Sequence, residues 1–413
     1  MDTLLIIGHT FPEPSTTAAG KRMMQLISFF EEHKFHIVFS STASISDKSV
    51  SFMDSQIEVK KIKLNDASFN DFIKELNPAI VLFDRFVTEE KFGWRVAEFC
   101  PEAIRVLDTE DLHFLRKARH EAFKNKKTIT DDYLFSETAI REIASIYRCD
   151  LSLIISEFEM NLLKTTFQLN SDLLFYLPFL TTNIESSTYL NLPSFEDRKH
   201  FVTIGNLLHA PNIDSVLYLK KEIWPGIRKQ LPEAELHVYG AYAPQHINEL
   251  HSENDKFLVK GWACEVTEIM KSAKICLAPL RFGAGLKGKF IDAMKNGTPS
   301  ITTTIGAEGL TGGFAFSGIV SDDIEALVQA SVNLYTHKKE WLKLQENGIA
   351  IINKRFNKNK FSEEFKIHLN KLLNAKEKYR KRNFIGQILQ YKNLQATKYM
   401  SKWIAEKNKN KEL

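Results

Sequence analysis

Short apolar runs alternate with longer amphipathic stretches along most of the chain. Each run has the length of a strand, and the stretch after it has the periodicity of a helix. Because strands buried on both faces appear as continuous apolar runs, the alternation predicts parallel sheets covered by helices. The predicted strands are 4–8, 37–41, 59–64, 80–84, 104–108 and 151–156 in the first half, and 201–205, 236–240, 257–259, 275–280 and 300–303 in the second.

A polar, proline-containing segment, 181–198, separates the two groups of strands. At 413 residues the chain is also too long for one ordinary core. We therefore expect an α/β protein with two Rossmann-like, doubly wound domains, residues 1–185 and 196–375, facing one another across a cleft. Ligands of such sheets bind beyond the carboxyl ends of the strands, so the loops there hold the candidate site.

The last 43 residues follow a different pattern. From Lys371 to Leu413 there are twelve Lys or Arg against three Glu, and apolar side chains recur at helical spacing. These are Phe384, Ile385, Ile388, Leu389, Tyr399, Trp403 and Ile404. The pattern predicts a basic amphipathic C-terminal helix, 376–413, whose apolar face docks on the first domain. The alternative is that this face lies on an anionic membrane.

Composition narrows the class of protein. Hydrophobic residues make up 44% and charged residues 26% of the chain, typical values for a globular protein. A net charge of +4 is too small to indicate a nucleic-acid partner. The four cysteines form no CxxC pair, which disfavours a cysteine zinc site. With no basic signal-peptide start and no membrane-length apolar run, we expect a cytoplasmic protein, with peripheral contact to the inner membrane face as the only membrane role.

The most informative segment is 278–310. An apolar strand leads into a glycine turn, and a helix begins near Leu286 and ends at Gly297, followed by Pro299. A further strand follows, so the segment is a βαβ unit. A helix N-terminus after a glycine turn is a site for anions.

Charged side chains in this segment suggest the ligand. Lys287 and Lys289 stand in the first turn of the helix, where cations are unfavourable unless an anion binds beside them. Asp292 lies one turn further along the face that carries Lys289 and Gly285. A phosphate at the turn and a hydroxylated group at the carboxylate describe a nucleoside diphosphate.

The segment resembles the donor-binding motif of retaining GT-B glycosyltransferases, glycosyltransferase family 4 (group 1). In that family a glycine-rich turn and a Glu-x7-Glu pair precede Ala-Met and Gly-x-Pro. Here Asp292 takes the place of the second glutamate, which binds ribose in the family, and Gly297-Thr298-Pro299 forms the turn. Ala284 stands where the first glutamate should be. The lysine-bearing turn resembles one branch of the family, which implies altered donor contacts.

Other segments resemble the family in the expected order: 12–20, 105–113, 149–159, 203–212 and 236–240. The resemblance implies that the loop ending at Gly20 lies near the donor phosphates and that His113 contacts the transferred sugar. It also implies a metal-independent enzyme whose donor is a UDP- or GDP-linked sugar. The expected donor-binding residues are Gly20, Asn206, Gly283, Gly285, Leu286, Lys287, Lys289 and Asp292.

Each of these residues has a structural alternative. His113 can be a helix-start residue hydrogen-bonded to Asp108 or Asp111, and the three together can also be read as metal ligands. No second ligand cluster completes a closed metal site, so no metal is expected. The two lysines can be exposed charges, and we expect them at a surface position. Asp292 can pair with Lys289 or Lys295 along the helix.

The predicted function is transfer of a sugar, with retention, from a nucleotide-sugar donor to a glycan, lipid-linked or protein-linked acceptor in cell-surface polysaccharide or glycoconjugate biosynthesis. Two alternatives remain. Ala284 permits a GT-B-like protein that binds nucleotide or glycan without turnover. A GT-B sugar-nucleotide epimerase is the other, although its active carboxylates have no evident counterpart in this sequence.

Overall fold

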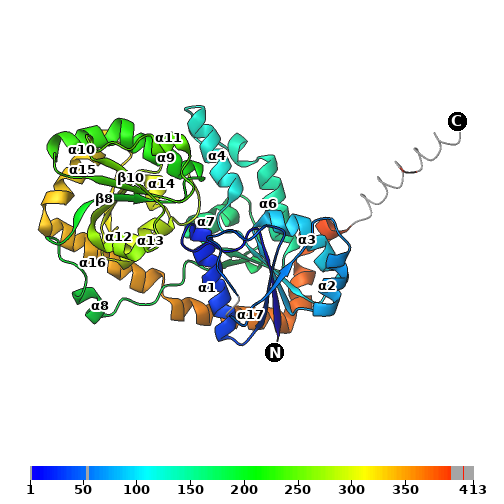
Figure 1. The fold of residues 1–413 in the computed structure, drawn as a ribbon. Coiled ribbons are helices and arrows are strands. Elements are labelled where there is room, and N and C mark those ends of the chain that lie inside the picture. Colours follow the sequence, from blue (N-terminus) through cyan, green and yellow to red (C-terminus); the bar gives the residue numbers. More distant parts are fainter. Residues whose placement is uncertain (1, 53–54, 392–402, 404–413) are drawn as a thin grey trace.

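The computed structural model describes residues 2–52, 55–391 and 403. Two α/β domains lie side by side, each with a parallel sheet between layers of helices (Figure 1). The first sheet has seven strands in the order β3-β2-β1-β4-β5-β6-β7, and the second has six in the order β10-β9-β8-β11-β12-β13. The predicted fold class, α/β with two doubly wound domains, is confirmed.

In the first sheet the strands are β1 (Thr3–Gly8), β2 (His36–Ser41), β3 (Glu58–Lys61), β4 (Ile80–Asp84), β5 (Ile104–Asp108), β6 (Leu151–Ile154) and β7 (Leu174–Tyr176). Its helices are α1 (Ala18–Glu32), α2 (Ser68–Leu76), α3 (Phe86–Phe99), α4 (His113–Lys124), α5 (Asp131–Leu134), α6 (Glu137–Arg148) and α7 (Glu157–Thr165), with a 3₁₀ turn, η1 (Ser171–Leu173).

In the second sheet the strands are β8 (Lys199–Ile204), β9 (Leu236–Tyr239), β10 (Phe257–Gly261), β11 (Ala273–Ala278), β12 (Ser300–Thr302) and β13 (Gly318–Val320). The helices around it are α8 (Ser186–Leu190), α9 (Ala210–Tyr218), α10 (Trp224–Gln230), α11 (Gln245–Asn248), α12 (Val266–Ser272), α13 (Gly288–Lys295), α14 (Thr304–Ala307), α15 (Ile324–Thr336) and α16 (Lys338–Arg355), with a π-helical turn, η2 (Leu219–Ile223). The chain then continues into α17 (Lys358–Arg382) and α18 (Phe384–Gln390).

The strand pattern follows from side-chain alternation. Successive residues of a strand point to opposite faces. Leu4 and Ile6 of β1 therefore pack in one core, and Leu5 and Ile7 pack in the other. Helices must cover both faces, so the strand appears in the sequence as an uninterrupted apolar run. The edge strands β7 and β13 were not predicted, because each has only three residues and is partly exposed.

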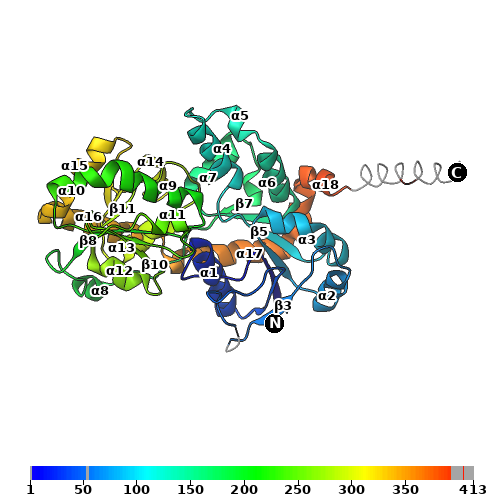
Figure 2. The same ribbon diagram turned by 45° about the horizontal axis from the view of Figure 1, so that its top comes forward.

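The chain crosses between the domains twice, and the crossings lie together. Thr181 forms a β-bridge with Asn357, its N–H donates to the Phe356 carbonyl at 2.7 Å, and its carbonyl accepts from the Lys358 N–H at 2.8 Å. From Lys358 onward α17 runs back beneath the first sheet, beside α1 (Figures 1 and 2). The predicted second domain, 196–375, therefore includes helical turns that pack on the first.

Aromatic packing explains why α17 lies against the first domain. The buried Phe365 ring lies 4.8 Å from the Phe29 ring and 5.4 Å from the Phe175 ring, centroid to centroid. Phe361 and Leu369 join the same core. The last quarter of the chain therefore completes the hydrophobic core that its first residues begin.

The helix α18 contacts α6 at the far end of the first domain (Figure 2). Asn383 Nδ2 donates to the Tyr147 carbonyl at 2.7 Å, and Gly386 is buried against the same carbonyl. The apolar residues predicted to dock, Phe384, Ile385, Ile388 and Leu389, are instead exposed, as is Trp403. The contact is made through polar groups and a glycine, since a Cβ at residue 386 would lie 2.2 Å from the Tyr147 carbonyl oxygen. Tyr399 and Ile404 lie outside the described residues.

None of the helices in the described part of the chain combines the length and the apolar character that crossing a bilayer requires.

Candidate functional site

A cavity of about 540 Å³ lies between the two domains. The first domain lines it with residues that follow strand ends, including His9 after β1, Arg85 after β4 and Glu110 after β5. The second domain contributes Asn206 after β8 and Gly283 after β11. The cavity therefore lies at the carboxyl ends of both sheets, where doubly wound folds bind ligands.

Most of the predicted site residues gather at this cavity. Those that line it are His113, Asn206, Gly283, Gly285, Leu286, Lys287, Lys289 and Asp292. Gly20 lines a smaller cavity next to it, which shares Arg85 and Asn206 with the first. Sequence positions almost 300 residues apart thus meet in one site, although their contact with a ligand remains a prediction.

The glycine turn of the second domain is held by a carboxylate of the first. Gly285 has φ +64° and its N–H donates to Glu159 Oε1 at 2.8 Å. A Cβ added at Gly285 would lie 2.8 Å from the Cβ of Asp111. Gly285 therefore permits both a left-handed backbone and the close approach of the opposite domain. The sequence alone suggests close approach to a ligand, and the structure adds this contact between domains.

Both lysines face the cavity between the domains. The expectation of a surface position is wrong for Lys287, whereas Lys289 is partly exposed. Lys287 is buried and its Nζ donates to the Gly285 carbonyl at 2.9 Å. The Nζ of Lys289 donates to Asn212 Oδ1 at 2.8 Å. Burial lowers the pKa of Lys287 and that of Lys289 to about 8 each, because the charged form loses water. Both side chains line the cavity at the N-terminus of α13, where the first N–H groups have no partner within the helix.

Asp292 pairs across the cleft. Its Oδ2 lies 2.5 Å from the Nζ of Lys21 in α1, and both side chains line the cavity. The predicted alternatives, Lys289 and Lys295, are not its partners: Lys289 is turned toward Asn212, and Lys295 is exposed at the other end of α13. A carboxylate has four lone-pair sites, so Asp292 can accept from a ligand hydroxyl while it remains paired with Lys21.

His113 is the first residue of α4 and its ring faces the cavity. The Nε2 atom lies 3.5 Å from Asp111 Oδ1, and the ring packs edge-on against Phe86 at 5.4 Å. Burial lowers the pKa of His113 to about 3, so the imidazole is neutral at neutral pH. A neutral ring offers one donor and one acceptor, which suits contact with sugar hydroxyls. Both the catalytic and the structural interpretation remain open for this residue.

Asp108 is not available to His113 or to a metal. Its buried carboxylate accepts from Nε and Nη2 of Arg22 at 2.8–3.0 Å. Arg22 also donates to the Leu177 carbonyl at 2.7 Å, so the pair ties α1 to the ends of β5 and β7. Asp111 pairs with Arg116 through Oδ2, while its Oδ1 lies 3.5 Å from His113 Nε2. Of the three residues in the metal alternative, Asp108 is therefore held by Arg22, apart from the other two.

Two buried glutamates hold the loop that ends at His113. Glu142 accepts from the N–H groups of His113 at 3.2 Å and Phe114 at 3.0 Å, and Glu159 accepts from Leu112 at 3.0 Å. Burial raises the pKa of Glu142 to about 8 and that of Glu159 to about 7. They satisfy the first N–H groups of α4 and its entry, which fixes the direction of the His113 side chain.

Sequence reasoning missed several charged residues of the cavity. Arg85 has φ +71°, and its Nε lies 3.6 Å from Asp84 Oδ1. Arg116 stands one turn after His113 on the same face of α4 and pairs with Asp111. Glu110 has one buried carboxylate oxygen, and burial, together with the negative charge of Asp108, raises its pKa well above the usual value. The position of Arg85 directly after a predicted strand was the available signal.

Further contacts join the two domains around the cavity. Arg119 donates to both carboxylate oxygens of Glu308 at 2.7 and 2.8 Å, and also to the Gly283 carbonyl at 2.8 Å. The His120 and Phe282 rings stack with centroids 4.3 Å apart. At the smaller cavity Tyr242 donates to Glu13 at 2.9 Å. Direct contacts between the domains therefore flank both cavities.

Comparison with known proteins agrees with this architecture. Residues 198–337, within the second domain, match the family model for glycosyl transferases group 1. Sucrose-phosphate synthase of Thermosynechococcus elongatus superposes with a TM-score of 0.68 at 14% identity, over 91% of this chain and all of that one. HepE of Anabaena, solved in complex with UDP and glucose, gives 0.67 at 11% identity over 90% of this chain and all of that one. At these identities the likeness establishes the fold.

A curated relative matches part of the sequence. An uncharacterized 44.6 kDa protein in the cps region of Klebsiella pneumoniae is 23% identical over 179 residues, which is 40% of this chain and 44% of that protein. The match thus spans less than half of that relative's length. The resemblance to GT-B glycosyltransferases of group 1 is confirmed by the family model and the fold together. The narrower assignment to family 4 stays a prediction.

Proposed function

We propose that this protein transfers a sugar from a UDP- or GDP-linked donor to a glycan, lipid-linked or protein-linked acceptor. The observation that carries the proposal is a pair of lysines beside the N-terminus of α13, in a cavity between the two domains, of which Lys287 is buried and Lys289 is partly buried. Removing ammonium groups from water is costly unless an anion offsets the cost when it binds. A diphosphate supplies that anion.

Each predicted site residue is assigned to one part of the nucleotide-sugar donor. Lys287 and Lys289 hold the diphosphate, and Asp292 accepts hydrogen bonds from the ribose. His113, as a neutral ring, contacts the transferred sugar. Since helix terminus and lysines neutralise the phosphates, no metal is required for donor binding.

The proposed reaction retains anomeric configuration. The bond between the anomeric carbon and the diphosphate breaks while the acceptor oxygen bonds to the same face of that carbon. The acceptor proton passes to an oxygen of the leaving diphosphate. The protein stabilises charge on the diphosphate and orients both substrates, and the closed cleft limits hydrolysis of the donor.

The acceptor is proposed from the setting of relatives. The Klebsiella pneumoniae relative belongs to a cps region, and HepE was solved with UDP and glucose. We therefore place this protein in cell-surface polysaccharide or glycoconjugate biosynthesis.

A panel of UDP- and GDP-sugars tests the function. Release of free nucleotide is measured for each sugar, with and without candidate acceptors, in buffer containing EDTA. Acceptor-dependent release with one donor, unchanged by EDTA, supports the proposal, and NMR of the product then assigns the anomeric configuration. Donor binding without release in any combination would favour the non-catalytic binding protein. Conversion of the donor sugar to its epimer would favour the epimerase.

We also propose that α18 places the protein against an anionic membrane surface on the cytoplasmic side. Phe384, Ile385 and Ile388 are 49–67% exposed, and the preceding turn carries the exposed Lys381 and Arg382. Exposed apolar side chains beside basic ones match the interfacial region of anionic bilayers.

Sedimentation with lipid vesicles tests this contact. The wild-type chain should bind phosphatidylglycerol vesicles more than phosphatidylcholine vesicles, and salt should weaken the binding. The double variant Phe384→Ser/Ile388→Ser should lose binding, whereas Ile140→Ser, which alters an exposed residue elsewhere on the first domain, should retain it. Equal binding by all three proteins would remove α18 from this role.

A further inference from the structure

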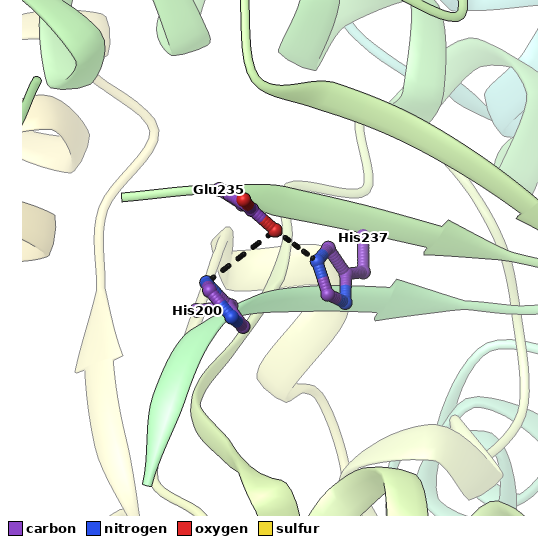
Figure 3. A group of neighbouring side chains, drawn as sticks. All are labelled: His200, Glu235 and His237. Atoms are coloured by element: carbon purple, nitrogen blue, oxygen red, sulfur yellow. Dashed lines mark hydrogen bonds and ion pairs between the residues drawn. The ribbon is translucent and has the colours of Figure 1, made fainter. Parts of the chain in front are cut away.

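A second group of potential ligands lies at the opposite end of the second sheet. His200 is near the start of β8, Glu235 directly precedes β9 and His237 is within β9. Figure 3 shows the Glu235 carboxylate between the two imidazole rings. The nucleotide cavity lies at the carboxyl ends of these same strands, about five residues or roughly 16 Å further along. The two places are therefore distinct.

Strand register brings the three side chains together. Phe201 of β8 pairs with Leu236 of β9, which places His200 next to Glu235 on the neighbouring strand. Residues two apart on a strand share a face, so Glu235 and His237 point the same way. The group is built on a sheet and not on a loop, which holds the three ligand atoms in a fixed arrangement.

The distances suit a small transition-metal ion. The Nε2 of His237 lies 2.8 Å from Glu235 Oε2, and the Nδ1 of His200 lies 3.7 Å from the same oxygen. One ligand atom from each residue can be chosen so that all lie within 4.8 Å of one another. Tetrahedral zinc with bonds of about 2.0–2.1 Å separates its ligand atoms by about 3.3 Å. The observed separations span this value, so small side-chain rotations suffice.

An unpaired ring nitrogen of His200 also favours a bound ligand. Its Nδ1 is buried and has no hydrogen-bond partner among the described residues. A buried nitrogen left without a partner costs free energy that a metal bond would recover. The residue has φ +62°, in the left-handed region, and its ring stacks on that of His237 with centroids 4.6 Å apart.

The carboxylate of Glu235 gives the group a negative charge that a divalent ion would offset. Lys256 Nζ lies 3.8 Å from Glu235 Oε1, but its side chain is 35% exposed and can turn to solvent. All three candidate ligands are partly exposed, so an ion can enter from solvent.

We propose that His200, Glu235 and His237 bind a divalent transition-metal ion of the zinc type. Two imidazole nitrogens and one carboxylate oxygen form the donor set, and water fills the remaining position. The ion joins the starts of β8 and β9 and stabilises the second domain. It takes no part in donor binding, so this proposal stands or falls independently of the proposed glycosyltransferase activity.

Metal titration of the full chain tests the site. Tag-free protein is treated with a chelator, dialysed and titrated with Zn²⁺ and with Co²⁺ by calorimetry at neutral pH. We expect one Zn²⁺ per chain, a rise in Tm on saturation, and the intense visible absorption of low-coordinate Co²⁺. His200→Ala and His237→Ala should each weaken Zn²⁺ binding at least tenfold and remove the rise in Tm.

Two further variants make the result decisive. Glu235→Gln keeps the size of the side chain and should weaken Zn²⁺ binding while leaving the circular dichroism spectrum unchanged. His246→Ala removes an exposed histidine of α11 in the same domain and should bind Zn²⁺ as the wild type does. The proposal is overturned if Glu235→Gln or the histidine variants bind Zn²⁺ with wild-type affinity, or if His246→Ala loses as much affinity as they do. Nucleotide affinity should be equal with and without chelator.

Discussion

At the scale of single residues, the cavity between the domains concentrates groups whose ionisation is shifted by burial. Lys287 and Lys289 have pKa values lowered to about 8, and His113 has a pKa lowered to about 3. Groups with shifted pKa values that meet in a cleft are typical of functional sites. These shifted pKa values lead to testable predictions for the affinity of the protein for nucleotides.

Lys287→Met and Lys289→Met should each weaken nucleoside diphosphate binding. Each loses a charge-assisted contact, about 1.5 to 3 kcal/mol or roughly 10- to 150-fold in Kd by calorimetry. Methionine preserves the packing, so Tm should not fall. Lys295→Met alters the exposed end of the same helix and should bind as the wild type does. Wild-type affinity in both cavity variants would refute the phosphate assignment.

The pH dependence follows from the same two lysines. Below pH 8 both ammonium groups are protonated and attract the diphosphate. As the pH rises through about 8 the free protein loses these protons, so binding must take them up again and the affinity must fall. Calorimetry between pH 7 and 9.5, in buffers of different ionisation enthalpy, should detect this proton uptake. The double Lys287→Met/Lys289→Met variant should show none.

His113→Ala should lower turnover and leave nucleotide affinity nearly unchanged, because the ring is placed at the sugar. Loss of one hydrogen bond to the reacting sugar gives about a 10- to 100-fold lower kcat. Steady-state rates and nucleotide Kd are measured on the same preparations. Unchanged kcat would leave His113 with its structural role at the start of α4.

Ala284→Glu should lower turnover even though it restores the carboxylate of the family motif. Ala284 packs against the core of the first domain, and the next residue in the chain contacts Glu159 and Asp111. A new carboxylate there would be crowded and would repel both acids and the donor phosphates. Rates with one working donor decide the matter. A gain in the variant would show that the site had lost a sugar contact.

At the scale of elements, the turn before α13 determines how closely the domains approach. Gly285→Ala should separate them, because the added methyl group would lie 2.8 Å from Asp111 Cβ at a residue with φ +64°. Overpacking adds about 1 to 3 kcal/mol to the backbone strain. We expect a lower Tm and weaker nucleotide binding.

Gly313→Ala is the matched control for this change. Gly313 has φ +91° but no atom within 4 Å of an added Cβ, so it carries the backbone strain without the collision. Equal losses of nucleotide affinity in the two variants would show that the turn does not set the approach of the domains.

At the scale of the whole molecule, the last described helices make the first domain depend on the end of the chain. Phe365→Ala should destabilise the first domain by about 3 to 5 kcal/mol, because the ring is buried among Phe29, Phe30 and Phe175. Hydrogen exchange should become faster in peptides of β1 and β2 and stay unchanged in those of β9 and β11. Ile367→Ala, at a residue 45% exposed, should cost no more than about 0.5 kcal/mol.

The sequence alone determined the elements and their order. Strands such as β4 and β5 were predicted with the same limits as those observed, because both of their faces are buried and the apolar run ends where the strand ends. The glycine turn and the end of α13 were also predicted: the helix ends at Lys295, two residues before Gly297, whose φ of +66° favours glycine. Strand limits, glycine turns and helix ends depend on backbone conformation and on the spacing of apolar residues, both of which are set by residues close together in the sequence.

The tertiary structure alone decided which charges meet. Asp292 pairs with Lys21 from another domain, Asp108 with Arg22, and Arg119 with Glu308. No spacing in the sequence encodes these pairs. Asp108 and Arg22 meet only because α1 packs beside the end of β5, and the other two pairs depend on how the two domains face one another. For the same reason the sequence could not tell that the lysines of the turn are covered, or that α17 completes the first core. The local sequence pattern determines whether a segment forms a strand, a turn or a helix. The burial of its side chains and their ion pairs depend on which segments pack against it in the folded chain.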